Sequence, residues 1–368
     1  MTEAETPLAP LKVPVHFVLM ARRAQWQDLM GGQPPASADA MAARFVECAD
    51  CWVAQTYVQL RRRGVAVTFS DRYERDAVNV VSRSELKIRD WPARHFVVGV
   101  QHDKSRPAIC DQRVVQNEIN VWDARVDHFV PHWPQPGLIR RDPARGARLE
   151  NLCFKGARTN LYDAFRSDAF LAELAKLGMK LVFDIKDNAE RQPHRWFDYG
   201  ECDAVLAVRD ATAEDLKLKP ASKLVNAWRA GAPALLSPEP AYRALRRGPL
   251  DYFEVSTPAE ALAALRRLRD EPWLYAAMVD NGLRRGATFS PDAVARRWHD
   301  VLGGPVATAF GRWRRWRGVL MPVRWAAFPF QCLKHKRFDR QYRAVRDVGH
   351  RPVREANEQA AAGGPGRL

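Results

Sequence analysis

A segment with three prolines and one glycine divides this chain into two parts. Residues 131–139 read Pro-His-Trp-Pro-Gln-Pro-Gly-Leu-Ile. Because proline lacks the N–H that helices and sheets need, this segment cannot form regular secondary structure. We therefore predict a linker over residues 133–148, with one domain before it at 13–132 and a second after it at 149–302. The 368 residues are enough for two domains with their own hydrophobic cores.

Short apolar runs alternate with helix-like patterns on both sides of this linker. Before it we expect strands at 13–20, 65–69, 95–101 and 126–130, and a helix at 41–62. After it we expect strands at 149–154, 180–185, 202–208 and 234–236, and helices at 162–177, 220–230, 240–246 and 258–269. Strands that alternate with helices predict parallel sheets, so the fold class is α/β with two Rossmann-like domains facing a cleft. Ligands of such sheets bind at the carboxyl ends of the strands.

The positive charge of the chain is concentrated near its end. Between residues 311 and 351, twelve Lys or Arg stand against Asp339 and Asp347, a net of +10 out of +15 for the chain. Trp and Phe are interleaved with these cations, which suits an anionic membrane surface. We predict a basic aromatic helical tail at 303–351 that contacts such a surface or packs on the first domain, with nucleic acid as the less favoured partner. Residues 1–12 and 352–368 are expected to be disordered.

Composition excludes several protein classes. Six cysteines give no disulfide framework, and the pair Cys48 and Cys51 is interpreted as core thiols in preference to half a zinc site or a redox dithiol. No apolar run approaches the roughly 18 to 20 residues of a membrane span. The first residues carry Glu3 and Glu5 in place of the cations of a secretory signal. We expect a cytoplasmic protein, with a peripheral position on the inner membrane face as an alternative.

The segment from Lys219 to Pro233 predicts an anion-binding helix start. Proline tolerates the first helical turn, so Pro220 opens a helix that ends at Gly231, directly before a short buried strand. Lys219 and Lys223 then lie near the free N–H groups of the helix start. Helix N-termini carry partial positive charge and unpaired donors, so this point suits a phosphate or diphosphate.

These residues resemble a known family. Lys219-Pro220, followed by Lys223-Leu-Val-Asn-Ala-Trp-Arg-Ala-Gly-Ala-Pro, is similar to the donor-site helix of GT-B glycosyltransferases, in which a lysine, an EAMAxGxP-like helix and a strand recur. The segment from Trp133 to about Leu302 resembles a carboxyl-terminal domain of the glycosyltransferase family 4 type. The resemblance implies the GT-B fold, with a nucleotide-sugar donor on the second domain. Where retaining members carry two glutamates, this chain has Leu218 and Asn226, so retention or inversion of configuration stays open.

The chemistry of sugar transfer explains the need for fixed cations. A nucleoside diphosphate leaves with growing negative charge, and cations aimed at it lower the barrier. The sequence has no Asp-x-Asp pair, the metal-binding signature of the other large glycosyltransferase fold. We therefore predict stabilisation of the leaving group by Lys219 and Lys223 without a metal, and no cofactor apart from the nucleotide-sugar substrate.

Four further residues of the second half are candidates for donor binding, and Asn226 on the predicted helix is a fifth. Gly156 follows a predicted strand and would let the backbone approach a phosphate, with Arg158 close behind; an ordinary turn is the alternative. Arg209 ends another strand on the ligand side of the sheet. Glu239 could accept hydrogen bonds from sugar or ribose hydroxyls, or cap the helix that follows it.

In the first half, three residues are candidates for the acceptor side. Asp103 follows the strand that ends at Gln101 and could be the general base for an acceptor hydroxyl, with a turn role as the alternative. Gln116 and Asn117 could contact the acceptor or cap a loop. Together these expectations describe a hexosyltransferase-like enzyme that moves a sugar from a nucleotide-sugar to a glycan or lipid-linked acceptor. The alternative is a non-catalytic nucleotide- or phosphosugar-binding protein, or a nucleic-acid binder through the tail.

Overall fold

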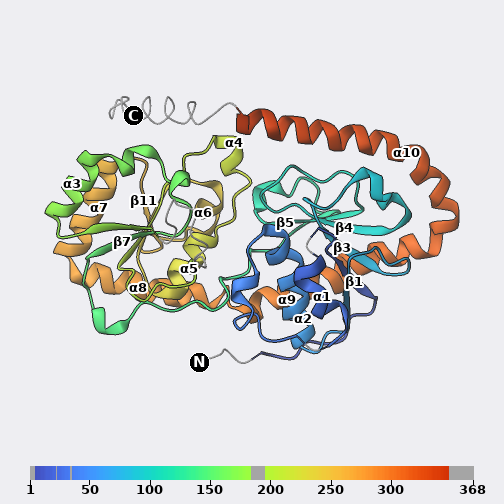
Figure 1. Cartoon of the computed structure of the whole chain (residues 1–368), viewed down its shortest axis with the longest axis horizontal. Coiled ribbons are helices and arrows are strands. Elements are labelled where there is room, and N and C mark those ends of the chain that lie inside the picture. Colours follow the sequence, from blue (N-terminus) through green and yellow to red (C-terminus); the bar gives the residue numbers. More distant parts are fainter. Residues whose placement is uncertain (1–4, 22, 34, 184–194, 348–368) are drawn as a thin grey trace. The chain divides into compact units, whose positions relative to one another are not determined.

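The chain forms two compact α/β units. The computed structural model describes residues 5–21, 23–33, 35–183 and 195–347 (Figure 1). Unit 1 comprises the chain up to Gly137, the short segment Leu218–Pro220, and Phe289–Ala344. Unit 2 comprises Leu138–Lys217, Ala221–Thr288 and the residues from Val345 onward. Each unit is built on its own parallel sheet, which confirms the predicted fold class.

Unit 1 contains a six-stranded sheet in the order β2-β1-β3-β4-β5-β6, and every pair of neighbours is parallel. Its strands are short and rich in valine, which suits a sheet covered on both faces. They are β1 (Val15–Val18), β2 (Val67–Ser70), β3 (Val78–Ser82), β4 (Phe96–Val100), β5 (Gln112–Val115) and β6 (Asp127–Phe129).

Side chains alternate between two cores, one on each face of this sheet. Val80 and Val98 point into a large core, whereas Val81 and Val97 point into a smaller one on the opposite face, as the two-residue period of a strand requires. The large core is covered by helices α1 (Gln27–Met30), α2 (Gln55–Arg62) and α9 (Pro291–Val301), and by the start of α10 (Ala307–Asp347).

Helix α10 passes from one face of the sheet to the other. Phe310 and Trp313 belong to the large core, and Phe328 belongs to the smaller core. Figure 1 shows the helix as an arc around unit 1. Pro322 and Pro329 lie inside it, and proline bends a helix because it removes a backbone hydrogen bond. Within the described chain, no helix is both long and apolar enough to cross a membrane.

Unit 2 contains a five-stranded parallel sheet in the order β11-β10-β9-β7-β8. Its strands are β7 (Asn151–Phe154), β8 (Lys180–Phe183), β9 (Ala204–Ala207), β10 (Ala234–Leu236) and β11 (Phe253–Glu254). Its helices are α3 (Asp168–Lys176), α4 (Ala213–Leu216), α5 (Ser222–Ala230), α6 (Pro240–Leu245), α7 (Pro258–Asp270) and α8 (Pro272–Ala287).

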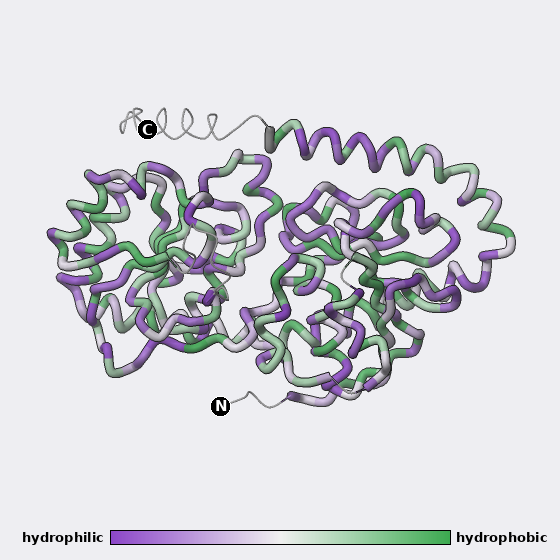
Figure 2. The backbone as a smooth tube through the Cα atoms, viewed as in Figure 1, coloured by the Kyte–Doolittle hydropathy of each residue, from purple (hydrophilic) through white to green (hydrophobic). Residues whose placement is uncertain are grey.

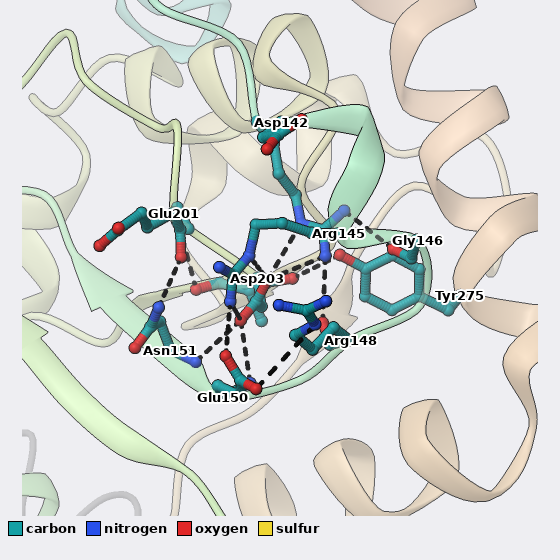
Figure 3. A network of polar contacts seen from close by, with 12 residues as sticks. Asp142, Arg145, Gly146, Arg148, Glu150, Asn151, Glu201, Asp203 and Tyr275 are labelled. Atoms are coloured by element: carbon teal, nitrogen blue, oxygen red, sulfur yellow. Dashed lines mark hydrogen bonds and ion pairs between the residues drawn. The ribbon is translucent and has the colours of Figure 1, made fainter.

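A buried ion network closes the amino edge of this sheet, where β7 and β9 begin (Figure 3). The carboxylate of Asp203 accepts from Arg141 at 2.8 Å and from Arg145 at 2.7 Å. It also accepts the backbone N–H groups of Glu150 and Asn151. Every carboxylate oxygen therefore has a donor, which is the condition for burying a charge without a large penalty.

The predicted linker is not a loose connection. Trp133 is buried in the large core of unit 1, where its ring N–H donates to Thr56. Arg141 and Arg145, in the second half of the segment, belong to unit 2 because they pair with Asp203. The chain first passes from unit 1 to unit 2 between residues 137 and 138.

Three other predicted boundaries were wrong. The second domain does not extend to residue 302, because the apolar face of α9, including Val294 and Trp298, packs in the core of unit 1. Residues 5–12 are ordered, since Leu8 and Leu11 pack on the same core. The helix predicted at 41–62 begins late, because the buried Asp50 accepts the N–H groups of residues 46 and 47 at its start. The predicted tail at 352–368 lies outside the described residues.

The helix predicted to open at Pro220 begins two residues later. Helix α5 starts at Ser222 with Ala221 as its N-cap, and Pro220 lies outside it. The predicted end is correct, because Gly231 adopts the left-handed conformation with φ of 74°, which glycine allows at a helix end. Lys219 therefore lies in the loop before the helix, and Lys223 lies in its first turn.

Candidate functional site

The carboxyl edge of the unit 2 sheet brings together two elements that are distant in sequence. Gly156 follows β7, and a Cβ added at this position would lie 3.1 Å from the Nζ of Lys223 in the first turn of α5. Lys223 donates to the backbone carbonyl of Lys155 and lies over the Phe154 ring at 5.1 Å. A glycine turn after a strand thus lies beside a lysine at a helix start.

The start of α5 has the properties of an anion site. Its N-cap is Ala221, which offers no side-chain oxygen to the first N–H groups of the helix. Ser222 and Lys223 then supply a hydroxyl and an ammonium in the first turn. The positive end of the helix dipole and a lysine in the first turn together favour a phosphate group.

Two more cations lie after β7. Lys155 is buried, donates to the backbone carbonyl of Asp198 and lies 4.7 Å from the centre of the Tyr199 ring. Arg158 is exposed, and its guanidinium lies 5.4 Å from the centre of the Phe183 ring. Sequence reasoning selected Arg158 and missed Lys155, which stands directly before the selected glycine.

Arg209 and Glu239 form a buried ion pair at the same edge. Arg209 follows β9, Glu239 follows β10, and the Nη1 to Oε2 distance is 3.0 Å. Glu239 is fully buried and also accepts from Ser237 at 3.0 Å. It occupies the N-cap position of α6, but its side chain makes no capping hydrogen bond. The capping alternative for Glu239 was therefore wrong, and its carboxylate positions Arg209.

The two lysines of the predicted phosphate clamp have different neighbours. Lys219 belongs to unit 1, where its Nζ lies 3.8 Å from a carboxylate oxygen of Asp103. Lys223 belongs to unit 2 and lies at Gly156. Asn226, one turn further along α5, is buried.

Gln116 and Asn117 follow β5 in unit 1 and hold the loop that carries Lys219. The Gln116 amide donates to the carbonyl of Leu218, and the Asn117 amide lies 3.4 Å from the carbonyl of Lys219. Both side chains are buried. These contacts match the loop-holding alternative for the two residues.

A chain of hydrogen bonds runs through His102 at the carboxyl end of β4. Its Nδ1 lies 3.0 Å from Oδ1 of Asp103, and its Nε2 lies 2.9 Å from the hydroxyl of Ser82 at the end of β3. His102 is buried and has a φ of 39°, which is left-handed backbone that a residue with a side chain rarely adopts. Such strain is concentrated at functional positions.

The electrostatics of this chain keep His102 neutral and Asp103 ionised. Burial lowers the pKa of His102, because an imidazolium loses its hydration, although Asp103 acts in the opposite direction. Burial alone would raise the pKa of Asp103, but the hydrogen bond from His102 and the charge of Lys219 lower it. The Nδ1 of His102 therefore donates to Asp103, and its Nε2 keeps a lone pair that accepts from Ser82.

Cys48 is the third group near this pair. Among the described residues, Cys48, His102 and Asp103 form the one cluster whose ligand atoms lie close enough to share an ion. Cys48 donates to Asp103 at 3.2 Å, and burial together with the Asp103 charge raises the pKa of its thiol. A protonated thiol that donates to a carboxylate is a hydrogen-bonding group, whereas a metal ligand is a thiolate.

The structure thus groups the predicted residues into two sets. Gly156, Arg158, Lys223, Asn226, Arg209 and Glu239 belong to unit 2, and Asp103, Gln116, Asn117 and Lys219 belong to unit 1. Sequence reasoning missed His102 as a functional candidate, although it stands directly after a predicted strand. Its left-handed backbone and its bond to Ser82 depend on tertiary structure and leave no sequence signal.

Comparisons with known proteins add the following findings. No protein-family model and no curated protein matches the sequence. Among solved structures, the chain is similar to Anabaena Alr3699/HepE in complex with UDP-glucose, with a TM-score of 0.49 and 11% identity over 79% of this chain and 99% of that one. It is also similar to sucrose-phosphate synthase from Thermosynechococcus elongatus, with a TM-score of 0.44 and 12% identity over 63% and 74% of the two chains.

A third similar structure is the pneumococcal O-GlcNAc transferase GtfA in complex with UDP and GlcNAc, with a TM-score of 0.41 and 12% identity over 62% of this chain and 57% of that one. At TM-scores below 0.5, function has to be inferred from the residues of this chain.

Proposed function

We propose that this protein transfers a sugar from a nucleotide-sugar donor to a glycan or lipid-linked acceptor. The observation that carries the proposal is the carboxyl edge of the unit 2 sheet, where Gly156 lies beside Lys223 at an uncapped helix start. This is the edge at which parallel α/β sheets bind their ligands. A diphosphate is the ligand that matches its charge and its backbone donors.

On the donor side, the diphosphate leaves with growing negative charge. Lys223 and the first N–H groups of α5 stabilise that charge. Arg209, fixed by its ion pair with Glu239, supplies a further positioned donor. Gly156 has no side chain, so a phosphate can approach the backbone at this position. A side chain here would contact Lys223. These residues form a leaving-group site that requires no metal.

On the acceptor side, His102 is a better candidate for the general base than Asp103. The pKa of both groups is lowered, but an imidazole ordinarily binds protons more strongly than a carboxylate, so His102 is the stronger base of the two. Asp103 then acts as a positioning residue that fixes the tautomer of His102. The hydroxyl of Ser82 already occupies the accepting nitrogen at hydrogen-bond distance.

A panel of nucleotide-sugars tests this function. Melting temperature is measured with each compound, because a ligand that binds only the folded state raises it. Compounds that bind are then incubated with the protein, and the released nucleoside diphosphate is measured. We expect one nucleotide-sugar to raise the melting temperature and to release its nucleoside diphosphate, slowly when the sugar is transferred to water and faster when it is transferred to an acceptor. Binding without release would support the non-catalytic alternative, and no binding at all would contradict both.

A further inference from the structure

Helix α10 has an outward face that unit 1 does not cover. Its inward residues recur every three or four positions and are buried or half-buried, from Phe310 and Trp313 through Phe328 to His335. The opposite side of the helix carries large apolar side chains that are more than half exposed. They are Trp316 (55%), Val319 (69%), Val323 (62%), Phe330 (73%) and Leu333 (63%).

These five residues form one continuous stripe, here called the outward stripe. Their spacing is three, four, seven and three residues, so they lie on one side of a helix with 3.6 residues per turn. Figure 2 shows hydrophobic and hydrophilic residues following one another along α10. Exposed apolar side chains are normal when scattered, but a contiguous stripe marks an interaction surface.

Cations flank the outward stripe at both ends. Arg312 and Arg315 precede it, and Lys334, Arg337 and Arg340 follow it at positions that continue the same helix side. All five are exposed. The acidic residue Asp339 faces inward, where it accepts from Arg83 and Ser105. From 307 to 345 it is the only acidic residue in the sequence.

We propose that the outward stripe of α10 docks on the surface of an anionic lipid bilayer. Its apolar side chains would enter the boundary between headgroups and acyl chains, and its flanking cations would contact lipid phosphates. The charge of the surface favours this partner over a second copy of the chain, because two copies would bring the same cations together. The helix would lie in the membrane surface, since it is not apolar enough to cross it.

The inward face of the same helix contacts the His102 loop. The hydroxyl of Tyr342 donates to the backbone carbonyl of Asp103 at 3.0 Å, and Asp339 holds Ser105 in the same loop. A bilayer-bound α10 would therefore hold the candidate base near the membrane surface. This consequence rests on the proposed function and selects the lipid-linked acceptor over the soluble glycan.

Vesicle co-sedimentation of the full chain tests the docking surface. We expect binding to vesicles of phosphatidylcholine mixed with phosphatidylglycerol, little binding to phosphatidylcholine alone, and weaker binding as salt is raised. The variant Val319→Glu/Val323→Glu/Phe330→Glu should lose most of its vesicle-bound fraction. The matched control is Trp273→Glu, which charges an equally exposed tryptophan (65%) on α8 and should bind like the unmodified protein.

Two further variants keep the test decisive. If the triple variant fails to fold, Phe330→Ser takes its place. It changes one highly exposed side chain and should reduce vesicle binding. The variant Arg312→Gln/Arg315→Gln/Lys334→Gln/Arg337→Gln should lose the preference for anionic lipid. Retained vesicle binding by the triple variant would overturn the proposal. A dimer that depends on these residues would also overturn it, as would binding of a duplex oligonucleotide, in place of vesicles, through the same residues. Nucleoside diphosphate binding is measured without vesicles, so a failure of docking is distinguishable from a failure of the proposed function.

Discussion

The two edges of the unit 2 sheet use cationic side chains in different ways. At the amino edge, Arg141 and Arg145 both donate to the buried carboxylate of Asp203. At the carboxyl edge, Lys155 and Lys223 donate to backbone carbonyl oxygens and lie over aromatic rings. The amino edge thus concentrates its arginines on one buried carboxylate, whereas the carboxyl edge distributes its cations over several partners, including the ion pair of Arg209 with Glu239.

This difference separates a stabilising role from a binding role. Charged groups that neutralise one another inside the fold contribute to the stability of unit 2, and removing one leaves the others buried without partners. A lysine in the first turn of a helix, beside the positive end of the helix dipole, suits an anionic ligand. Residue type alone does not distinguish the two, since both edges carry basic residues near glycine turns. Variants at each edge test whether stability and ligand binding depend on different residues.

The largest expected effect is on stability, at the amino edge. Replacing Asp203 with alanine leaves Arg141 and Arg145 without their carboxylate, so the free energy of unfolding should fall by about 3 to 5 kcal/mol. Urea unfolding measures this change. Glu150→Ala removes an exposed partner of Arg145 and should cost less than about 1 kcal/mol. Equal stability of the two variants would contradict a stabilising role for the network.

Stability at low pH gives a second test of the same edge. Burial alone would raise the pKa of Asp203, but hydrogen bonds from Arg145 and neighbouring N–H groups lower it. A carboxyl group whose pKa is lower in the folded than in the unfolded protein stabilises the fold at pH values above its unfolded pKa of about 3.9. This stabilisation is lost as pH falls below that value. Urea unfolding across this range should show a loss in the unmodified protein that is smaller in Asp203→Asn. Parallel curves for the two proteins would contradict the assignment.

The next effect is on catalysis and lies in unit 1. His102→Gln should lower the transfer rate by about 10²- to 10⁴-fold, because it removes the proposed base. Nucleoside diphosphate affinity should not change, since His102 is not part of the unit 2 edge. In the unmodified protein, the lowered pKa of His102 should keep the rate high as pH falls to 6.5, the ordinary histidine value, and the rate should decline only at lower pH. An unchanged rate in the variant would exclude His102 as the base.

The smallest effect is expected at Gly156. Alanine at this position would bring a Cβ to 3.1 Å from Lys223 and 3.2 Å from the Phe154 ring, so Lys223 has to move. We expect the movement of Lys223 to cost about 1 kcal/mol, which corresponds to a loss of affinity for nucleoside diphosphate of about fivefold. Titration calorimetry measures it. Gly248→Ala is the matched control, because a Cβ there would contact nothing within 4 Å, and a similar loss in that control would contradict the role of Gly156.

Local patterns in the sequence predicted much of the fold. The valine-rich runs gave β1, β2, β4 and β6, and the Gly231 stop gave the end of α5 and the start of β10. β3, β5 and β11 were missed, because each has a short apolar run that polar residues interrupt or flank. The assignment of α9 to unit 1 was also missed, since only tertiary packing decides which core an amphipathic helix covers.

The candidate site was predictable where the topology of a parallel sheet brings residues together. Gly156 and Lys223 meet because both follow from the strand-turn-helix pattern of a parallel sheet. His102 and Ser82 meet through the pairing of β3 with β4, and that pairing could not be predicted once β3 was missed. The separation of Lys219 from Lys223 depended on where α5 begins, and helix starts are difficult to place when the N-cap is an alanine.

The proposed transfer reaction depends on binding of the donor diphosphate at the carboxyl edge of unit 2. The most direct test is titration calorimetry of a nucleoside diphosphate into three proteins: unmodified, Lys223→Ala, and Lys217→Ala, whose lysine forms an exposed pair with Glu214. Losing a charge-assisted hydrogen bond should weaken binding to Lys223→Ala by about 10- to 100-fold. The Lys217 variant should bind like the unmodified protein. Equal affinity of all three proteins would contradict diphosphate binding at this edge.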